Sequence, residues 1–171
     1  MTVGLHCETE RKYLIHYPDV DRIRTLPDCV EWQIEQIYLT EDDTGTTRRV
    51  RQIIEDGQKR YYRTFKRRIS VLSSIEDEAE IDGNTYRALL KERDTKRQPI
   101  IKTRLRAPYR GHVLEFDIYP FWHDRAILEI ELEHEDDAPE IPDFVNIIRD
   151  VSGEKAYKNR QLAKSVPMEE I

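Results

Sequence analysis

The chain has 171 residues, of which 36% are charged and 38% hydrophobic, and its net charge is −6. This length supports a single domain over residues 1–171, and the acidic balance excludes a general nucleic-acid coat, which needs a strongly basic surface. No apolar stretch reaches the roughly 20 residues of a membrane span, and the first residues lack the apolar run of a signal peptide. We therefore expect a soluble cytoplasmic protein with neither a nucleic-acid nor a membrane partner.

Turn signals divide the chain into segments that are mostly too short for long helices. The connections EDDTG, EDGQ and APYRG have the length and composition of loops between antiparallel neighbours. The segments between turns therefore predict a mainly β protein with an antiparallel sheet. Strands are expected near residues 5–13, 31–40, 47–54, 60–69, 73–81, 99–106, 112–119 and 126–134.

Three stretches break the strand period of two and predict short amphipathic helices with one apolar stripe each. A final segment, YKNRQLA, is expected to add another helical turn or two. The apolar stripes comprise Val20, Ile23 and Leu26; Tyr86, Leu89 and Leu90; and, after Asp143, Phe144, Ile147 and Ile148.

Charged residues alternate with apolar residues along most of the predicted strands, so each strand has one charged face. Glu8, Glu10 and Lys12 share a face of the first strand, and His6, on the same face, is interpreted as a strand-end residue rather than a ligand. For any single strand, a solvated outer face is the simplest explanation. Whole strands of one charge sign are unusual in an ordinary sheet, because like charges two residues apart repel unless opposite charges or ions lie nearby.

These alternating faces predict a closed barrel of about eight strands with its charged face inside and its apolar face outside. The short helices would then cover the apolar exterior. An open sheet with one solvated face is the competing architecture.

The charged interior would suit a linear run of phosphates. Arginine matches phosphate oxygens in bidentate geometry, and lysine adds compact positive charge. The carboxylates would repel such a substrate unless Mg²⁺ or Mn²⁺ lay between acid and phosphate, which makes Glu8, Glu10, Glu129 and Glu131 predicted metal ligands. The predicted phosphate-binding residues are Lys12, Arg49, Arg51, Lys66, Lys102 and Arg104.

The segment ETERK, at residues 8–12, resembles the ExExK motif of the CYTH superfamily, also called triphosphate tunnel metalloenzymes. Segments similar to the family's successive motifs follow in order along nearly the whole chain. They are RVR at 49–51, TFK at 64–66, EDEAEI at 76–81, KTR at 102–104, LEFD at 114–117, LEIEL at 128–132 and YKN at 157–159.

The resemblance implies an eight-stranded antiparallel tunnel, dependence on Mg²⁺ or Mn²⁺, and a small anionic triphosphate substrate. It adds Asp117 to the metal-side carboxylates, and it gives Glu8, Glu10 and Lys12 catalytic positions. Inorganic triphosphatase is the activity it favours. Nucleoside or thiamine triphosphatase, a class IV type of adenylate cyclase and a noncatalytic polyphosphate-binding module stay open as alternatives, as does a homodimer.

Three positions depart from the family's pattern. Ser74 stands where many similar sequences have arginine, Asp150 stands for a glutamate, and Ala156 lies where a basic residue is common. Lys155 or Lys158 could supply the missing charge from the C-terminal segment.

Overall fold

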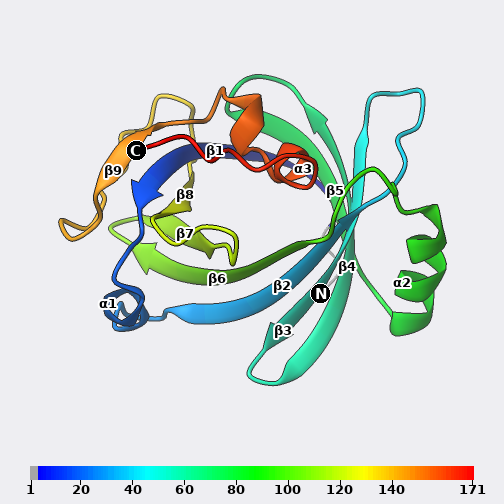
Figure 1. The fold of residues 1–171 in the computed structure, drawn as a ribbon, viewed down its shortest axis with the longest axis horizontal. Coiled ribbons are helices and arrows are strands. Elements are labelled where there is room, and N and C mark those ends of the chain that lie inside the picture. The colour runs from blue at the N-terminus through cyan, green and yellow to red at the C-terminus, as the bar shows by residue number, and fades with distance from the viewer. Residues whose placement is uncertain (1–3) are drawn as a thin grey trace.

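The structure is a computed structural model that describes residues 4–171. Eight antiparallel strands form a closed barrel in the order β5, β4, β3, β2, β6, β7, β8 and β1, with β1 pairing again with β5, and a ninth strand, β9, joins the edge of β1 (Figure 1). The strands are β1 Leu5–His16, β2 Val30–Tyr38, β3 Thr47–Glu55, β4 Gln58–Arg68, β5 Ser73–Ile81, β6 Ile100–Tyr109, β7 His112–Ile118, β8 Arg125–Glu131 and β9 Ile147–Asp150. The helices are α1 Val20–Arg24, α2 Gly83–Leu89 and α3 Asn159–Leu162, with short 3-10 helices η1 Leu90–Glu92 and η2 Lys155–Tyr157.

The eight strands of the barrel confirm the strands predicted from alternation, and their ends differ by only a few residues. The β3–β4 and β6–β7 connections are two-residue turns in which both residues have positive φ, 48° and 76° at Asp56 and Gly57 and 46° and 83° at Arg110 and Gly111. This backbone conformation matches the right-handed twist of the flanking strands. The turn residues therefore fix the register of both hairpins.

Strand β1 changes partner along its length, and this change closes the barrel. Its first half pairs with β5, from Leu5 opposite Asp77 to Thr9 opposite Ser73. Its second half pairs with β8, from Glu10 opposite Glu131 onward. One continuous strand therefore brings the two ends of the sheet together.

The prediction of a helix around residues 143–148 is wrong. The chain instead makes a turn and then forms β9, which pairs with β1 through Tyr13 opposite Asp150 and Ile15 opposite Ile147. The second half of β1 extends beyond the end of β5 and would otherwise leave backbone groups unpaired. The unpaired edge of β1 cannot be predicted from the spacing of apolar residues around Ile147.

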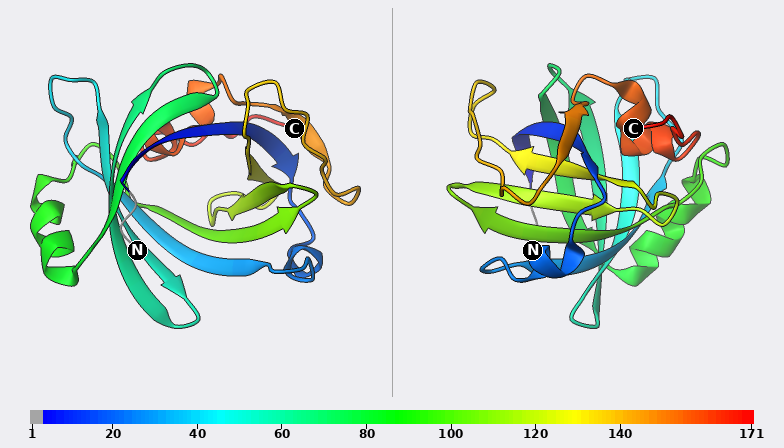
Figure 2. Two further views of the ribbon diagram at one scale, coloured as in Figure 1. Left: turned by 180° about the vertical axis from the view of Figure 1, so that it is seen from behind. Right: turned by 60° about the vertical axis from the view of Figure 1, so that its left-hand side comes forward.

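The apolar faces of the strands point outward and are covered by short helices, as expected. Ile23 of α1 belongs to a cluster with Ile15, Leu105 and Phe116, whereas Tyr86 of α2 packs with Val50 over β3 and β4. Figure 2 shows α2 on the outside of the barrel, beside these strands. None of the helices in residues 4–171 has the length and apolar character needed to cross a membrane.

One end of the inner face is apolar. Lys12 is followed at the same strand parity by Leu14, and Glu129 is preceded by Ile127. Leu14 and Ile127 pack with Tyr157 of the C-terminal segment, in a cluster that also contains Tyr38, Tyr119, Trp122, Val151 and Leu162. The chain after β9 therefore completes the core at this end of the barrel.

Truncation of Ile23 tests whether α1 is part of the core. Its side chain is fully buried, so Ile23→Ala should lower the free energy of unfolding by about 2–5 kcal/mol. Urea unfolding measures the change. Asp21→Ala, on the exposed face of the same helix, should change it by about 0.5 kcal/mol or less. Equal effects of the two substitutions would contradict the packing described.

Candidate active site

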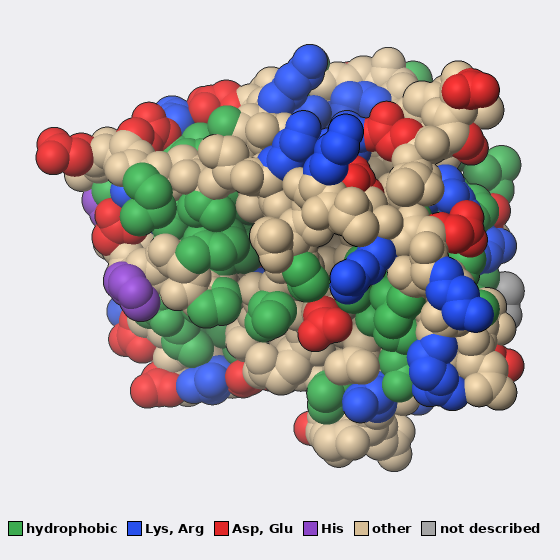
Figure 3. All heavy atoms as spheres, turned by 45° about the vertical axis from the view of Figure 1, so that its right-hand side comes forward, with side chains coloured by type: hydrophobic (Ala, Val, Ile, Leu, Met, Phe, Trp, Pro, Cys, Tyr) green, Lys and Arg blue, Asp and Glu red, His purple; other side chains and the backbone are tan. Residues whose placement is uncertain are grey.

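The inner faces of the strands surround a cavity of about 890 Å³. Its lining includes every residue predicted to bind phosphate and every predicted metal ligand except Asp117. Most of the basic side chains are buried: Lys12, Arg51, Lys102 and Arg104 expose 9% or less of their surface. The outer surface still has charged groups of both signs among apolar ones (Figure 3). The barrel therefore brings charges from distant strands together inside without removing charge from the exterior.

A first group of ion pairs links β6, β7, β8 and β1. Arg104 is at its centre, with Nε 2.7 Å from Asp117 Oδ1, Nη1 2.9 Å from Glu115 Oε2 and Nη2 3.0 Å from Glu129 Oε2. Lys102 Nζ lies 2.7 Å from Asp117 Oδ2, and Lys12 Nζ lies 3.1 Å from Glu129 Oε1. These contacts hold three predicted phosphate-binding residues in fixed positions.

Asp117 lies behind this group, not on the cavity surface. It is fully buried, and both of its oxygens accept hydrogen bonds from Lys102 or Arg104. Its position suits orientation of the two bases, because both oxygens are already engaged.

A second group of ion pairs joins β3, β4 and β5. Lys66 Nζ is 3.0 Å and Arg49 Nη2 is 3.7 Å from Glu76 Oε1. Arg51 Nη2 donates to Glu78 Oε2 at 2.8 Å, and Thr64 donates to the same oxygen. Each predicted phosphate-binding base thus has a carboxylate partner within the barrel.

The prediction from sequence did not assign Glu76, Glu78 and Glu115 to the site, although all three line the cavity. The available signal was their alternation, since Glu76 and Glu78 share a strand face and Glu115 shares one with Asp117. Alternation gives the face of a strand but not the partner across the barrel.

Burial and pairing shift the pKa values of these carboxyl groups in opposite directions. Burial alone would raise the pKa of Glu129, but Lys12 and Arg104 hold it well below its usual range. Burial would likewise raise the pKa of Glu76, which Arg49 and Lys66 lower to about 2. These two carboxylates are therefore ionised at neutral pH.

Two other carboxyl groups behave differently. Burial, followed by repulsion from Glu76, raises the pKa of Glu8 to about 7. Burial also raises the pKa of Glu115 to about 7, although Arg104 opposes the shift. Glu8 and Glu115 are therefore less well stabilised as carboxylates than Glu76 and Glu129, and a cation bound beside either group would favour its ionised form.

Beside Lys12 there is a seam in the barrel wall, that is, a gap in strand pairing along one edge of β1. Strand β5 pairs with β1 only as far as Thr9, and β9 pairs with it from Tyr13 onward. Ser152 fills this seam: its Oγ accepts a hydrogen bond from Lys12 N at 2.9 Å, and Val151 N donates to Lys12 O at 2.9 Å. Ser152 N in turn donates to Oδ1 of Asp150, and Oδ2 of the same carboxylate accepts a hydrogen bond from Arg11. The segment Asp150–Ser152 therefore holds the backbone of Lys12.

The C-terminal segment also reaches the cavity. Asn159 accepts a hydrogen bond from Tyr119 at 2.6 Å, and Arg160 forms an ion pair with Glu41 of the β2–β3 loop. Lys155 and Lys158 line the cavity, whereas Ala156 is exposed and does not. Burial and then Arg68 lower the pKa of Lys158 to about 8. The two lysines are therefore placed where they can add positive charge at the cavity.

Ser74, the remaining departure, is buried in β5 opposite Glu8 of β1. The short side chain at this position gives no cationic partner to Glu8.

Ser152 can be tested through stability. Ser152→Ala leaves the buried Lys12 N–H without its side-chain acceptor and should lower the free energy of unfolding by about 1–3 kcal/mol. Ser152→Thr keeps the hydroxyl and should lose clearly less. Urea unfolding of both variants measures the difference, and equal losses would show that the hydroxyl does not seal the seam.

The raised pKa of Glu115 predicts a pH-dependent stability. The folded protein holds this proton more tightly than the unfolded chain, so Glu115 makes the protein less stable as pH rises from about 4.5 to about 7. Glu115→Gln removes this loss. Relative to wild type, the variant should therefore gain up to about 3 kcal/mol between pH 4.5 and pH 8. Urea unfolding across this range measures the gain, and a constant difference would contradict the shift.

Comparisons with known proteins give matches among solved structures alone: no family model matches the chain, and no curated protein matches it. The crystal structure of the inorganic triphosphatase NE1496 is 26% identical, with a TM-score of 0.56, and the match covers 94% of this chain and 99% of that one. The protein PH1819 from Pyrococcus horikoshii OT3 is 20% identical, with a TM-score of 0.58, over 75% of this chain and 80% of that one.

A third structure extends the similarity in fold. It is the adenylyl cyclase candidate HpAC1 from Hippeastrum, described as having a dominant triphosphatase activity, with 16% identity and a TM-score of 0.50 over 74% of this chain and 80% of that one. At this identity the likeness concerns the fold alone. The eight-stranded barrel, its inward charges and the similarity to an inorganic triphosphatase over 94% of the chain are consistent with the resemblance to the CYTH superfamily of triphosphate tunnel metalloenzymes.

Proposed function

We propose that the protein is a divalent-metal-dependent triphosphatase that hydrolyses inorganic tripolyphosphate to pyrophosphate and phosphate. The observation that carries the proposal is the cavity itself, in which six basic side chains from four strands meet a set of carboxylates. The structural similarity to the inorganic triphosphatase NE1496 supports the same reaction class.

The basic residues suit a chain of phosphates because they are already oriented. Arg104 and Lys102 are fixed by Asp117, and Arg51 by Glu78. Phosphate oxygens can replace or share these carboxylate partners without a large rearrangement of the bases. Preorganised positive charge stabilises the charge that develops on transferred and leaving oxygens.

The carboxylates fit a hard divalent cation. Glu8, Glu10, Glu129 and Glu131 all line the cavity, and oxygen ligands of this kind are those that Mg²⁺ and Mn²⁺ use beside phosphate groups. When bound, such an ion would neutralise phosphate charge and polarise the reacting phosphoryl group. These four glutamates would supply oxygen ligands to it.

The attacking water needs a proton acceptor, and Glu115 suits this role. It lines the cavity, and its pKa of about 7 is close to the pH at which a general base works best. Its Oε2 is held by Arg104 Nη1, which fixes the carboxyl group near the phosphate-binding residues.

The contacts of Trp32, an aromatic side chain that lines the cavity, favour an inorganic substrate over a nucleotide. Its Nε1 donates to Glu55 at 2.8 Å, and the guanidinium of Arg106 lies 5.9 Å from its ring centre. Both the polar edge and a face of this ring are therefore engaged within the protein. A nucleobase would have to displace these contacts in order to stack there.

The test is phosphate release from tripolyphosphate in the presence of Mg²⁺ or Mn²⁺. Lys12→Ala and Glu8→Gln should each lower the rate by about 100-fold or more, because the first removes positive charge from the phosphate site and the second removes an oxygen ligand of the metal ion. Lys59→Ala, an exposed lysine of β4 that does not line the cavity, is the matched control and should keep the wild-type rate.

Circular dichroism and thermal unfolding establish that the variants are folded. Full turnover by folded Lys12→Ala and Glu8→Gln would overturn the assignment of the site. Stoichiometric binding of tripolyphosphate without turnover under either metal would identify a binding module, whereas ATP converted to cyclic AMP and pyrophosphate would identify a cyclase.

A further inference from the structure

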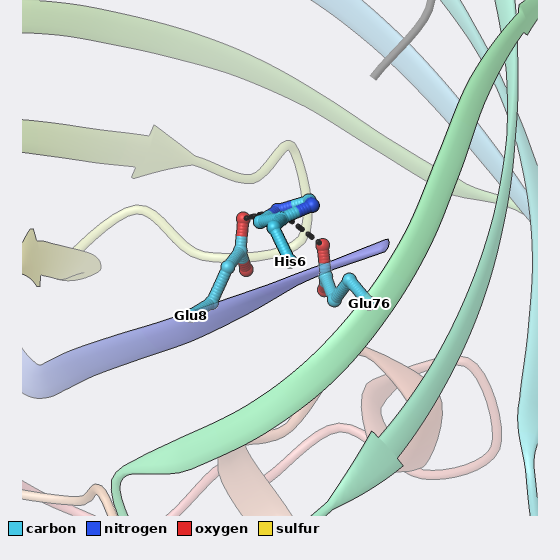
Figure 4. A group of neighbouring side chains, drawn as sticks. All are labelled: His6, Glu8 and Glu76. Atoms are coloured by element: carbon cyan, nitrogen blue, oxygen red, sulfur yellow. Dashed lines mark hydrogen bonds and ion pairs between the residues drawn. The ribbon is translucent and has the colours of Figure 1, made fainter. Parts of the chain in front are cut away.

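His6, Glu8 and Glu76 converge at the junction of β1 and β5 (Figure 4). His6 Nε2 is 3.2 Å from Glu8 Oε1 and 4.0 Å from Glu76 Oε2, and one ligand atom from each residue lies within 4.8 Å of the others. The strand register explains the convergence, because His6 lies directly opposite Glu76 and shares a face with Glu8.

These separations are close to those of ligands on one metal ion. Nitrogen and oxygen ligands lie about 2.0–2.2 Å from a first-row divalent ion, so two ligands of the same ion are about 3–4 Å apart. Rotation of the flexible glutamate side chains would bring all three atoms into this range. All three residues also line the cavity, which leaves room for water and phosphate oxygens as further ligands.

The imidazole of His6 is oriented in the manner of a metal ligand. Its Nδ1 lies 3.2 Å from the backbone oxygen of Gly4, to which it can donate its hydrogen. Nε2 lies within hydrogen-bond distance of Glu8 Oε1, and in the neutral tautomer that donates from Nδ1 its lone pair would face the two carboxylates. Metal-binding histidines usually donate their second ring nitrogen to a carbonyl or carboxylate in this way.

Glu76 divides its two oxygens between different partners. Oε1 faces the cations Lys66 and Arg49, whereas Oε2 faces His6. The neighbouring bases therefore stabilise the charge of Glu76 without occupying the oxygen that would meet a metal ion.

We propose that His6, Glu8 and Glu76 together bind a divalent transition-metal ion such as Mn²⁺ in the charged cavity. Glu8 belongs to the carboxylate set already assigned, whereas His6 and Glu76 are additional ligands, and the inference rests on the metal dependence of the proposed triphosphatase. Imidazole nitrogen is a better ligand for transition metals than for Mg²⁺, which prefers oxygen. His6 therefore gives this chain a preference for Mn²⁺ over Mg²⁺.

The experiment is pulsed electron paramagnetic resonance of the full-length protein loaded with Mn²⁺ alone. The wild-type spectrum should contain hyperfine coupling to an imidazole nitrogen, and His6→Ala and His6→Asn should lose it. His123→Ala, an exposed histidine distant in sequence from the cluster, should keep it. Titration should show Mn²⁺ binding weakened about tenfold or more in His6→Ala, with Mg²⁺ binding changed by about twofold or less.

Absence of nitrogen coupling in wild type, or its persistence in both His6 variants, would overturn the proposal. Circular dichroism establishes that the variants are folded, and the partly exposed position of His6 suits substitution. Tripolyphosphate hydrolysis is measured separately. Nitrogen coupling without hydrolysis contradicts the proposed function alone, whereas hydrolysis without nitrogen coupling contradicts this metal site alone.

Discussion

The structure depends on the cost of placing like charges side by side inside a protein. A buried ion loses several kcal/mol of hydration, which is recovered only through well-placed partners or a wet cavity. Here carboxylates and bases of neighbouring strands pair inside the barrel, as Lys12 does with Glu129 and Lys66 does with Glu76. Each charged strand is stable because the barrel supplies its counter-charge.

Barrel closure is therefore required for the proposed chemistry as well as for the fold. Strand β1 pairs with both β5 and β8, which places Glu8 in the β3–β5 group of charges and Lys12 in the β6–β8 group. Because β1 changes partner, one of its edges would have unpaired backbone groups. Strand β9 and the side chain of Ser152 provide hydrogen-bond partners along this edge. The apolar cluster at one end and the helices outside provide the core that the charged interior cannot.

The alternation of charge along the strands predicted the barrel and its inward charged face, with an open sheet as the competing architecture, and the breaks in that alternation predicted the covering helices α1 and α2. It could not predict β9, because the apolar spacing around Ile147 fits a short helix and the unpaired edge of β1 is visible only in three dimensions. It placed Glu115 and Asp117 on one face but could not show that Asp117 lies behind Arg104. His6 was interpreted from the sequence as a strand-end residue. Its proximity to Glu76 depends on the register between β1 and β5, which the sequence alone does not give.

A crystal structure with a slowly hydrolysed tripolyphosphate analogue and Mn²⁺ would locate the phosphate chain directly. We expect the chain inside the barrel, with its oxygens within hydrogen-bond distance of Lys12, Lys102 and Arg104. An analogue bound to the outer surface, or a barrel in which these three side chains point to bulk solvent, would contradict this expectation.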